Sequence, residues 1–176
     1  VMIYRFDAAW NGEVIAEARA DWVEPYLGLN FPASDIPRQA RELFQLCKVR
    51  LIPDALYTPS ALVASTDAQG IDLGRSSLRS VSPIHLEYLK NMGARATLVG
   101  ALVVEDRLWG LLSCQQKQEP RYFAPAERDI LGWLCDDLSA LIEARLIRAR
   151  HARERSLAAR RQTLIESIRA LEFKAL

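Results

Sequence analysis

The side chains best suited to chemistry in this chain are one carboxylate, one imidazole, one phenol and two guanidinium groups. Asp35 lies in a turn bounded by prolines, while His85 and Tyr88, three positions apart, share one face of an expected helix. Arg50 and Arg79 add planar donors that form bidentate pairs with carboxylates. Taken singly, each has an ordinary explanation as a helix cap, a core residue or a surface charge. A purely structural domain has no use for all five together, so the set favours a ligand site.

These residues do not make a catalytic centre. No Ser-His-Asp order matches a nucleophilic triad, and no phosphate-binding loop is present. His85 and His151 are the only histidines, which makes a histidine-based metal site improbable. Cys47, Cys114 and Cys135 have no redox spacing. We therefore expect neither an enzyme nor a metal protein.

Composition bounds the class of protein. The 176 residues are 50% hydrophobic and 26% charged, as in ordinary soluble domains, and can bury one core. The net charge of +1 indicates no class of partner. The longest apolar run, residues 96–104, is too short to span a bilayer. Three cysteines do not form a disulfide framework, so we expect a cytoplasmic protein. Because the chain opens at Val1 already strand-like, we also expect it to be a piece of a longer polypeptide.

The N-terminal part reads as a hairpin followed by irregular chain. Residues 1–7 and 13–18 have strand composition, and Asn11-Gly12 between them predicts the turn. Residues 19–34 contain several breakers and no period. A helix follows, with Asp35 as its N-cap, Pro37 in its first turn and helical spacing at Ala40, Leu43, Phe44 and Cys47.

The middle of the chain predicts a short strand, a long connection, a helix and a hairpin. The strand is 50–52, and the connection covers residues 54–80, a length that usually indicates a function. Ser82-Pro83 opens the helix and Gly93 ends it. Residues 97–104 and 108–114 flank a turn at 105–107, and their apolar character predicts strands covered on both faces.

The C-terminal part, from Pro125 to about Phe173, predicts one long helix. It carries one apolar stripe near its start (Ile130, Leu134, Leu138, Leu141, Ile142) and another near its end (Leu164, Ile165, Ile168, Leu171). Residues 143–161 between them hold seven arginines against two glutamates. No aromatic residues interleave these charges, so we favour a solvated connector with a dimer seam over a nucleic-acid contact.

Two motifs resemble the chromophore-pocket signatures of the phytochrome GAF domain, in its bacterial, biliverdin-binding branch. They are Phe31-Pro32-Ala33-Ser34-Asp35-Ile36-Pro37 and the stretch from Ser82 to Gly93 that contains His85. The resemblance implies an α+β GAF fold, with a central antiparallel sheet, helices on both faces and a long C-terminal exit helix. It also implies a chromophore-binding GAF domain over residues 1–142 and a helical connector toward a PHY domain over 143–176.

The resemblance assigns roles to the site residues around a bilin, a linear tetrapyrrole with two propionates. The Asp35 carbonyl would accept from pyrrole N–H groups, His85 would contact the ring nitrogens and a propionate, and Arg50 and Arg79 would bind the propionates. The remaining contacts it implies are an aromatic cage of Tyr4, Phe31 and Tyr88, an amide at Gln115, and smaller contacts at Ile36, Pro37, Ser82 and Thr97.

Three positions depart from the family pattern. Ile84 stands where plant-type phytochromes have the bilin-linking Cys, so we expect this fragment to bind bilin noncovalently. Gln115 replaces a His that bonds the outer-ring carbonyl; an amide can still donate but does not titrate near neutrality. Phe44 replaces a Tyr that bonds a propionate, which removes a hydrogen bond worth about 1 kcal/mol.

The resemblance therefore implies a red/far-red photoreceptor fragment with biliverdin or a related bilin as its pigment. Isomerisation at ring D would be relayed through the exit helix to an output module. The expected partners are upstream PAS and downstream PHY and output domains and a second copy of the chain, but neither nucleic acid nor a membrane. The alternative is a degenerate GAF module that serves dimerisation or signal relay without a pigment.

Overall fold

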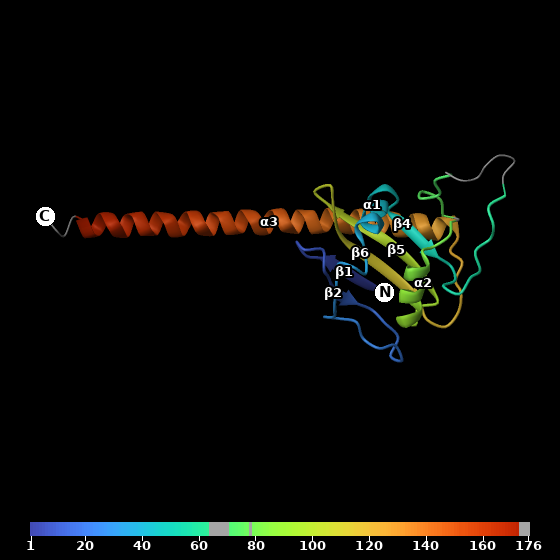
Figure 1. Ribbon diagram of the computed structural model, residues 1–176. Coiled ribbons are helices and arrows are strands. Elements are labelled where there is room, and N and C mark those ends of the chain that lie inside the picture. The colour runs from blue at the N-terminus through green and yellow to red at the C-terminus, as the bar shows by residue number, and fades with distance from the viewer. Residues whose placement is uncertain (64–70, 78, 173–176) are drawn as a thin grey trace. The chain divides into compact units, whose positions relative to one another are not determined.

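Within the described residues of this computed structural model, which are 1–63, 71–77 and 79–172 (backbone alone for 170–172), six strands form one antiparallel sheet (Figure 1). The strands are β1 (Met2–Phe6), β2 (Gly12–Glu17), β3 (Asn30–Phe31), β4 (Val49–Ile52), β5 (Ala96–Val104) and β6 (Arg107–Gln116), in the spatial order β3-β2-β1-β6-β5-β4. The helices are α1 (Arg38–Leu46), α2 (Pro83–Asn91) and α3 (Pro125–Glu172). This arrangement confirms the predicted α+β fold and its antiparallel sheet.

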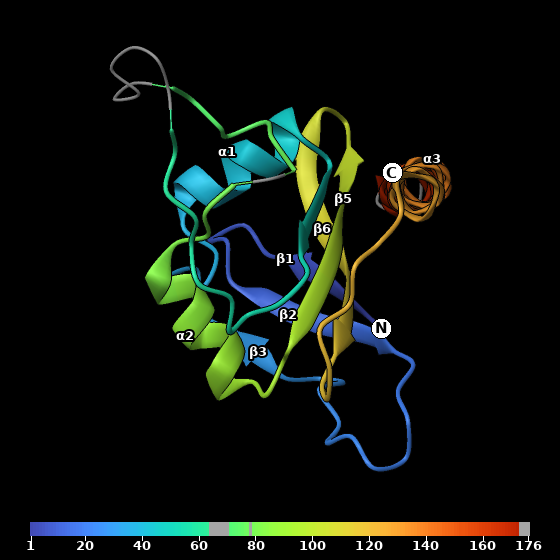
Figure 2. The ribbon, with the colours of Figure 1, turned by 90° about the vertical axis from the view of Figure 1, so that its right-hand side faces the viewer.

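Helices lie on both faces of the sheet, with α1 and α2 on one face and the start of α3 on the other (Figure 2). Leu131 and Cys135 of α3 stand against Gly100 of β5, where any larger side chain would overlap the Cys135 sulfur. The Ser139 hydroxyl accepts a hydrogen bond of 3.0 Å from the Val103 N–H, where the β5–β6 register shifts. These contacts fasten the first part of α3 to the sheet.

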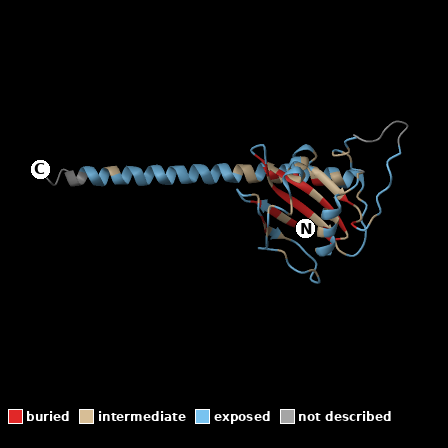
Figure 3. Cartoon of the chain, in the orientation of Figure 1, coloured by how far each residue is buried: buried red, intermediate tan, exposed pale blue. Residues whose placement is uncertain are grey.

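The buried core follows the central strands, and Figure 3 shows the burial concentrated there. Its largest cluster lies on the α1 and α2 face and comprises Met2, Tyr4, Phe6, Val14, Ala101, Leu108 and Leu111. β5 is buried along most of its length and β6 along about half of it, in its middle, in line with the apolar character of both strands. Contacts divide the chain into two compact units, and the boundary along the sequence lies between Ser139 and Ala140. The second unit, Ala140–Leu176, contains the rest of α3, and most of its described side chains are exposed.

The first hairpin has a different turn from the predicted one. Gly12 lies inside β2, opposite Phe6, rather than in the turn. The Asp7 carboxylate accepts bonds of 2.8 Å from the backbone N–H groups of Ala9 and Asn11, and so organises a longer turn over residues 7–11. A side chain at Gly12 would overlap the ring of Tyr4, which explains why glycine stands in the strand.

Asp35 does not cap α1, contrary to the prediction. The helix begins at Arg38, and its N-cap is Pro37, whose ψ of 163° is extended. A proline disfavours the helical region for the residue before it, here Ile36, which accounts for a helix that begins only after Pro37. The Asp35 N–H instead donates to the Pro32 carbonyl at 3.0 Å.

Several other boundaries were predicted with mixed success. Ser82 and Pro83 open α2, with Ser82 at the N-cap position but without a capping bond from its side chain, and Gly93, at a φ of +64°, follows the helix end, as expected. The β5–β6 turn is Glu105-Asp106, both at positive φ, so Arg107 belongs to the strand instead. The short strand β3 was not predicted. Parts of the long connection (64–70 and 78) and the predicted helix end at Phe173 lie outside the described residues.

Candidate functional site

The candidate site lies on the sheet face that carries α1 and α2. On β1, Tyr4 pairs with Leu111 of β6, and farther along β6 Gln115 pairs with Thr97 of β5. Alternate residues of a strand share a face, and directly paired residues share it too. The sheet therefore presents Tyr4, Thr97 and Gln115 together, with Thr97 buried and Gln115 half-buried.

Tyr4 forms the centre of the aromatic wall. Its ring lies 5.9 Å from that of Phe31 and 5.2 Å from that of Phe6, the latter edge to face. Its hydroxyl is buried and makes no hydrogen bond with the described residues. Burial, followed by the negative charge of Asp35, raises the pKa of Tyr4 to about 12. Tyr4 is thus a neutral phenol with an unused donor, next to a carboxylate.

Arg41 of α1 stabilises the turn that contains Asp35 by a hydrogen bond to its backbone. The Arg41 guanidinium donates to the Ile36 carbonyl at 2.7 Å and lies 4.6 Å from the centre of the Trp10 ring. The Asp35 side chain is half-buried and accepts a long bond of 3.4 Å from the Ser34 hydroxyl. The inward orientation of the Asp35 carbonyl stays a prediction.

α2 supplies the imidazole and the second phenol. The rings of His85 and Tyr88 are stacked, with centroids 5.9 Å apart and planes 16° apart, as their spacing on one helix face predicted. Burial, followed by the positive charges of Arg79 and Arg50, lowers the pKa of His85 below 6.5. The pKa of Tyr88 is raised by burial and then by the charge of Asp35. Both rings are therefore neutral at neutral pH.

Arg50 and Arg79 lie close enough to act on each other and on His85. Arg50 of β4 donates to the Gly74 carbonyl at 3.0 Å, and Arg79 donates to the Ser76 carbonyl at 3.3 Å. Burial lowers the pKa of each arginine, and the charge of Arg50 lowers that of Arg79 further. Among the described residues, neither guanidinium has a carboxylate within ion-pair distance. Two half-buried cations without anionic partners make this part of the site suited to an anionic ligand.

The other residues predicted to contact the ligand differ in burial: some pack against the core and others are exposed. Phe31, Ile36 and Phe44 pack against the core cluster that contains Tyr4. Pro37 and Ser82 are exposed at the N-caps of α1 and α2. A contact from either of these two to a ligand stays a prediction.

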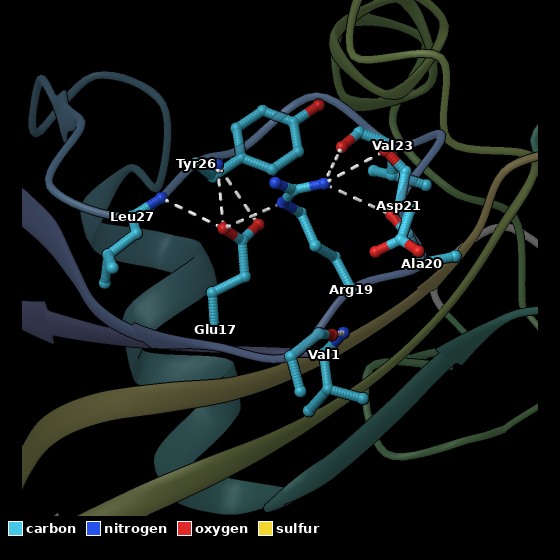
Figure 4. A network of polar contacts seen from close by, with 9 residues as sticks. Val1, Glu17, Arg19, Ala20, Asp21, Val23, Tyr26 and Leu27 are labelled. Carbon is cyan, nitrogen blue, oxygen red and sulfur yellow. Dashed lines mark hydrogen bonds and ion pairs between the residues drawn. The ribbon is translucent and has the colours of Figure 1, made fainter.

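Sequence analysis missed Tyr26, which reaches the Gln115 end of the site from the connection between β2 and β3. The Glu17 carboxylate accepts from the backbone N–H of Tyr26 at 3.1 Å, and Arg19 donates to the Val23 carbonyl at 2.7 Å (Figure 4). Tyr26 and Gln115 line one groove of about 400 Å³. No residue pattern marked Tyr26, because its stretch has no period and its position depends on these local bonds.

Two of the thiols, those of Cys114 and Cys135, are held in the protonated form by burial. Burial raises the pKa of the Cys114 thiol and raises that of Cys135 to about 11. The Cys47 thiol is half-buried and donates to the Val49 carbonyl at 3.5 Å. The described residues contain no group of His, Cys, Asp and Glu side chains placed to hold a metal, and none of their helices is long and apolar enough to cross a membrane.

Comparison with known proteins gives a family match over most of the chain. A family model described as GAF domain matches residues 1–142. Among curated proteins, a bacteriophytochrome of Xanthomonas campestris pv. campestris is 49% identical over 168 residues, which is 94% of this chain and 26% of that protein. A bacteriophytochrome of Pseudomonas aeruginosa is 42% identical, over 88% of this chain and 24% of that protein. The chain thus spans about a quarter of the length of these relatives.

Solved structures give the same match. The chromophore-binding domain of a Stigmatella aurantiaca bacteriophytochrome, in the Pr state, superposes with a TM-score of 0.78 at 51% identity, over 81% of this chain and 47% of that one. The corresponding domain of an unusual bacteriophytochrome from R. palustris gives 0.77 at 41% identity, over 81% and 49%.

Proposed function

We propose that this chain binds biliverdin and senses red and far-red light. The premise is that the chain belongs to the GAF domain family and is the GAF domain of a bacterial phytochrome. The observation that carries this proposal is the pair of half-buried guanidinium groups, Arg50 and Arg79, without carboxylate partners among the described residues. A bilin has two propionates, and each would find a cation there.

The other groups of the site fit the rest of such a ligand. The buried Tyr4 hydroxyl without a partner needs an acceptor, because an unsatisfied buried donor costs about 1–3 kcal/mol. Neutral His85 offers one donor and one acceptor to ring nitrogens or their water. Asp35 adds a negative charge near the centre, which favours the protonated form of a pyrrole system. The aromatic side chains supply the flat walls.

A bound bilin would supply the absorption of light and the isomerisation about the bond between its last two rings. The chain would supply the walls around that ring, from Tyr4, Phe31 and Tyr88, and an amide donor at Gln115. A change on this face would reach α3 through the sheet, because Cys135 and Ser139 of α3 contact β5 directly. We propose that α3, whose later part belongs to the predicted connector over residues 143–176, carries the change to a PHY domain and an output module.

Further partners are proposed on the same basis. The curated relatives are about four times as long as this chain, which leaves room for upstream PAS and downstream output domains. The exposed apolar side chains of the second unit, among them Leu141, Leu164 and Ile168, favour a homodimer. A cytoplasmic location accords with free rather than paired cysteines.

A degenerate GAF module without pigment is the second candidate, and two residues favour it. Gln115 and Phe44 replace hydrogen-bonding side chains of the family pattern. Such a module would need no pair of buried cations, so Arg50 and Arg79 could be replaced without loss of its function.

One titration separates the two functions. Purified protein is mixed with biliverdin and its visible spectrum is recorded; we expect a sharp red band, whereas an unchanged free-pigment spectrum contradicts the proposal. Biliverdin dimethyl ester, whose propionates carry no charge, is the matched control ligand and should bind more weakly.

The noncovalent character of the binding has its own test. Because Ile84 occupies the place of the linking Cys, the pigment should be lost on a denaturing gel. A pigment band that migrates with the chain would show that one of the three cysteines forms a bond to it.

A further inference from the structure

We propose that Lys117 is a positioning residue, which holds α2 and Tyr26 together at the Gln115 end of the site and thereby sets the surroundings of the bound pigment. This inference rests on the proposed function, since it concerns the same site. Lys117 lies just beyond the end of β6 and is half-buried. It belongs to none of the motifs on which the resemblance was based.

The Lys117 ammonium, the Tyr26 hydroxyl and the Met92 carbonyl, from three parts of the chain, are all hydrogen-bonded to one another. The ammonium donates to the Met92 carbonyl at 2.7 Å and to the Tyr26 hydroxyl at 2.9 Å. The Tyr26 hydroxyl itself donates to the same Met92 carbonyl, at 3.2 Å. The ammonium also lies 4.9 Å from the centre of the Tyr26 ring. One cation thus joins β6, the connection before β3 and the end of α2.

The place of Met92 explains why this contact acts on the site. Met92 is the C-cap of α2, and its N–H donates to the Tyr88 carbonyl at 3.0 Å. The last carbonyl groups of a helix carry partial negative charge, so an ammonium there fixes the helix end favourably. α2 carries both His85 and Tyr88, the two side chains that would contact the ligand. A displacement of the C-terminal end of α2 would therefore move both of them.

Tyr26 provides a second route from Lys117 to the ligand. It packs against the core cluster of Tyr4 and lines the groove that also contains Gln115. Gln115 lies at the end of β6 and Lys117 follows just beyond it, and both line the same groove as Tyr26. The ammonium therefore fixes the neighbours of the position where the family's His is replaced by an amide.

The test compares three substitutions. Lys117→Met keeps the length of the side chain and removes both bonds, while Lys117→Arg keeps a cation that can donate to both acceptors. Lys90→Met is the matched control: Lys90 lies exposed in the last turn of α2, and its ammonium takes part in none of the described hydrogen bonds or ion pairs. Each variant is titrated with biliverdin, and the position and width of the red band are measured.

We expect Lys117→Met to weaken biliverdin binding about tenfold, which corresponds to about 1.4 kcal/mol, and to broaden and shift the red band. Lys117→Arg should restore most of both properties, and Lys90→Met should leave them unchanged. A red band and an affinity for Lys117→Met equal to those of the wild type would overturn the proposal. So would equal effects of Lys90→Met and Lys117→Met, because the loss would then follow from charge alone.

A measurement without pigment separates this inference from the proposed function. Amide hydrogen exchange over residues 88–94 should be faster in Lys117→Met than in the wild type or Lys90→Met, because the helix end loses its anchor. If the wild type binds no biliverdin, the proposed function fails, and the exchange still reports whether Lys117 holds α2. If exchange is faster while the spectrum is unchanged, Lys117 merely stabilises the fold and its positioning role is wrong.

Discussion

Replacing Arg79 with methionine should affect ligand binding and protein stability in different ways. In the unliganded protein the Arg79 guanidinium donates a bond of 3.3 Å to the Ser76 carbonyl, the one hydrogen bond of its side chain with the described residues, worth about 1 kcal/mol. Against this bond stand the loss of hydration on burial and repulsion from Arg50, the same two causes that lower the pKa of Arg79. Because these effects oppose the contribution of the hydrogen bond, we expect the free energy of unfolding to change by no more than about 1 kcal/mol.

Binding should respond much more strongly. A hydrogen bond between charged groups contributes about 1.5–3 kcal/mol, so losing the contact to a propionate should raise the Kd for biliverdin by about 10- to 150-fold. Absorbance titration gives the Kd, and denaturant unfolding of the unliganded protein gives the stability. Arg75→Met is the control, because Arg75 is an exposed arginine of the same connection.

The dimethyl ester of biliverdin completes a double comparison. If Arg79 acts on a propionate, the ester should bind wild type and Arg79→Met about equally, because the group that Arg79 recognises has lost its charge. Equal affinity of wild type and variant for biliverdin would refute the assignment. An equally large loss with the ester, or a loss of stability well above 1 kcal/mol, would refute it too, since the effect would then be structural.

Two further outcomes follow from the packing and charges of the site. Burial and the two arginines lower the pKa of His85 below 6.5, so the folded state binds fewer protons than the unfolded state. The free energy of unfolding of the unliganded protein should therefore fall as the pH drops below about 6.5. The variant His85→Gln should flatten this dependence in unfolding experiments at pH 5 to 7.5. An equally steep dependence in His85→Gln would contradict this reasoning. Gly12→Ala should lower the free energy of unfolding by about 1–3 kcal/mol, because the new methyl group overlaps the Tyr4 ring. Gly132→Ala, whose methyl group meets only ordinary contacts within a helix, is its control and should be neutral or stabilising by up to about 1 kcal/mol; equal effects of the two would rule out the overlap.

Local patterns predicted the elements better than their ends. Ser82-Pro83 and Gly93 bracket α2 because capping and positive φ depend only on neighbouring residues. The first hairpin was predicted, but its turn was wrong, since the Asp7 side chain competes for backbone N–H groups. Asp35 was wrong as a helix cap because Pro37 delays the helix.

The candidate site divides in the same way. The spacing of His85 and Tyr88 was enough to predict that their rings share a helix face, and the rings are indeed stacked. Tyr26 and Lys117 could not be predicted, since the residues they contact lie far away along the chain.

The amino-acid sequence by itself determined which chemical groups this protein has, and that Tyr4, Arg50 and Thr97 lie on strands and His85 and Tyr88 on one helix, because propensity, period and capping act over a few residues. Only the tertiary structure decided that the charge of Asp35 reaches Tyr4 of β1 and Tyr88 of α2, and that no carboxylate among the described residues pairs with Arg50 or Arg79. The physical reason is that such contacts depend on strand register and on the path of long connections. Both are set by the burial of the whole sheet face at once.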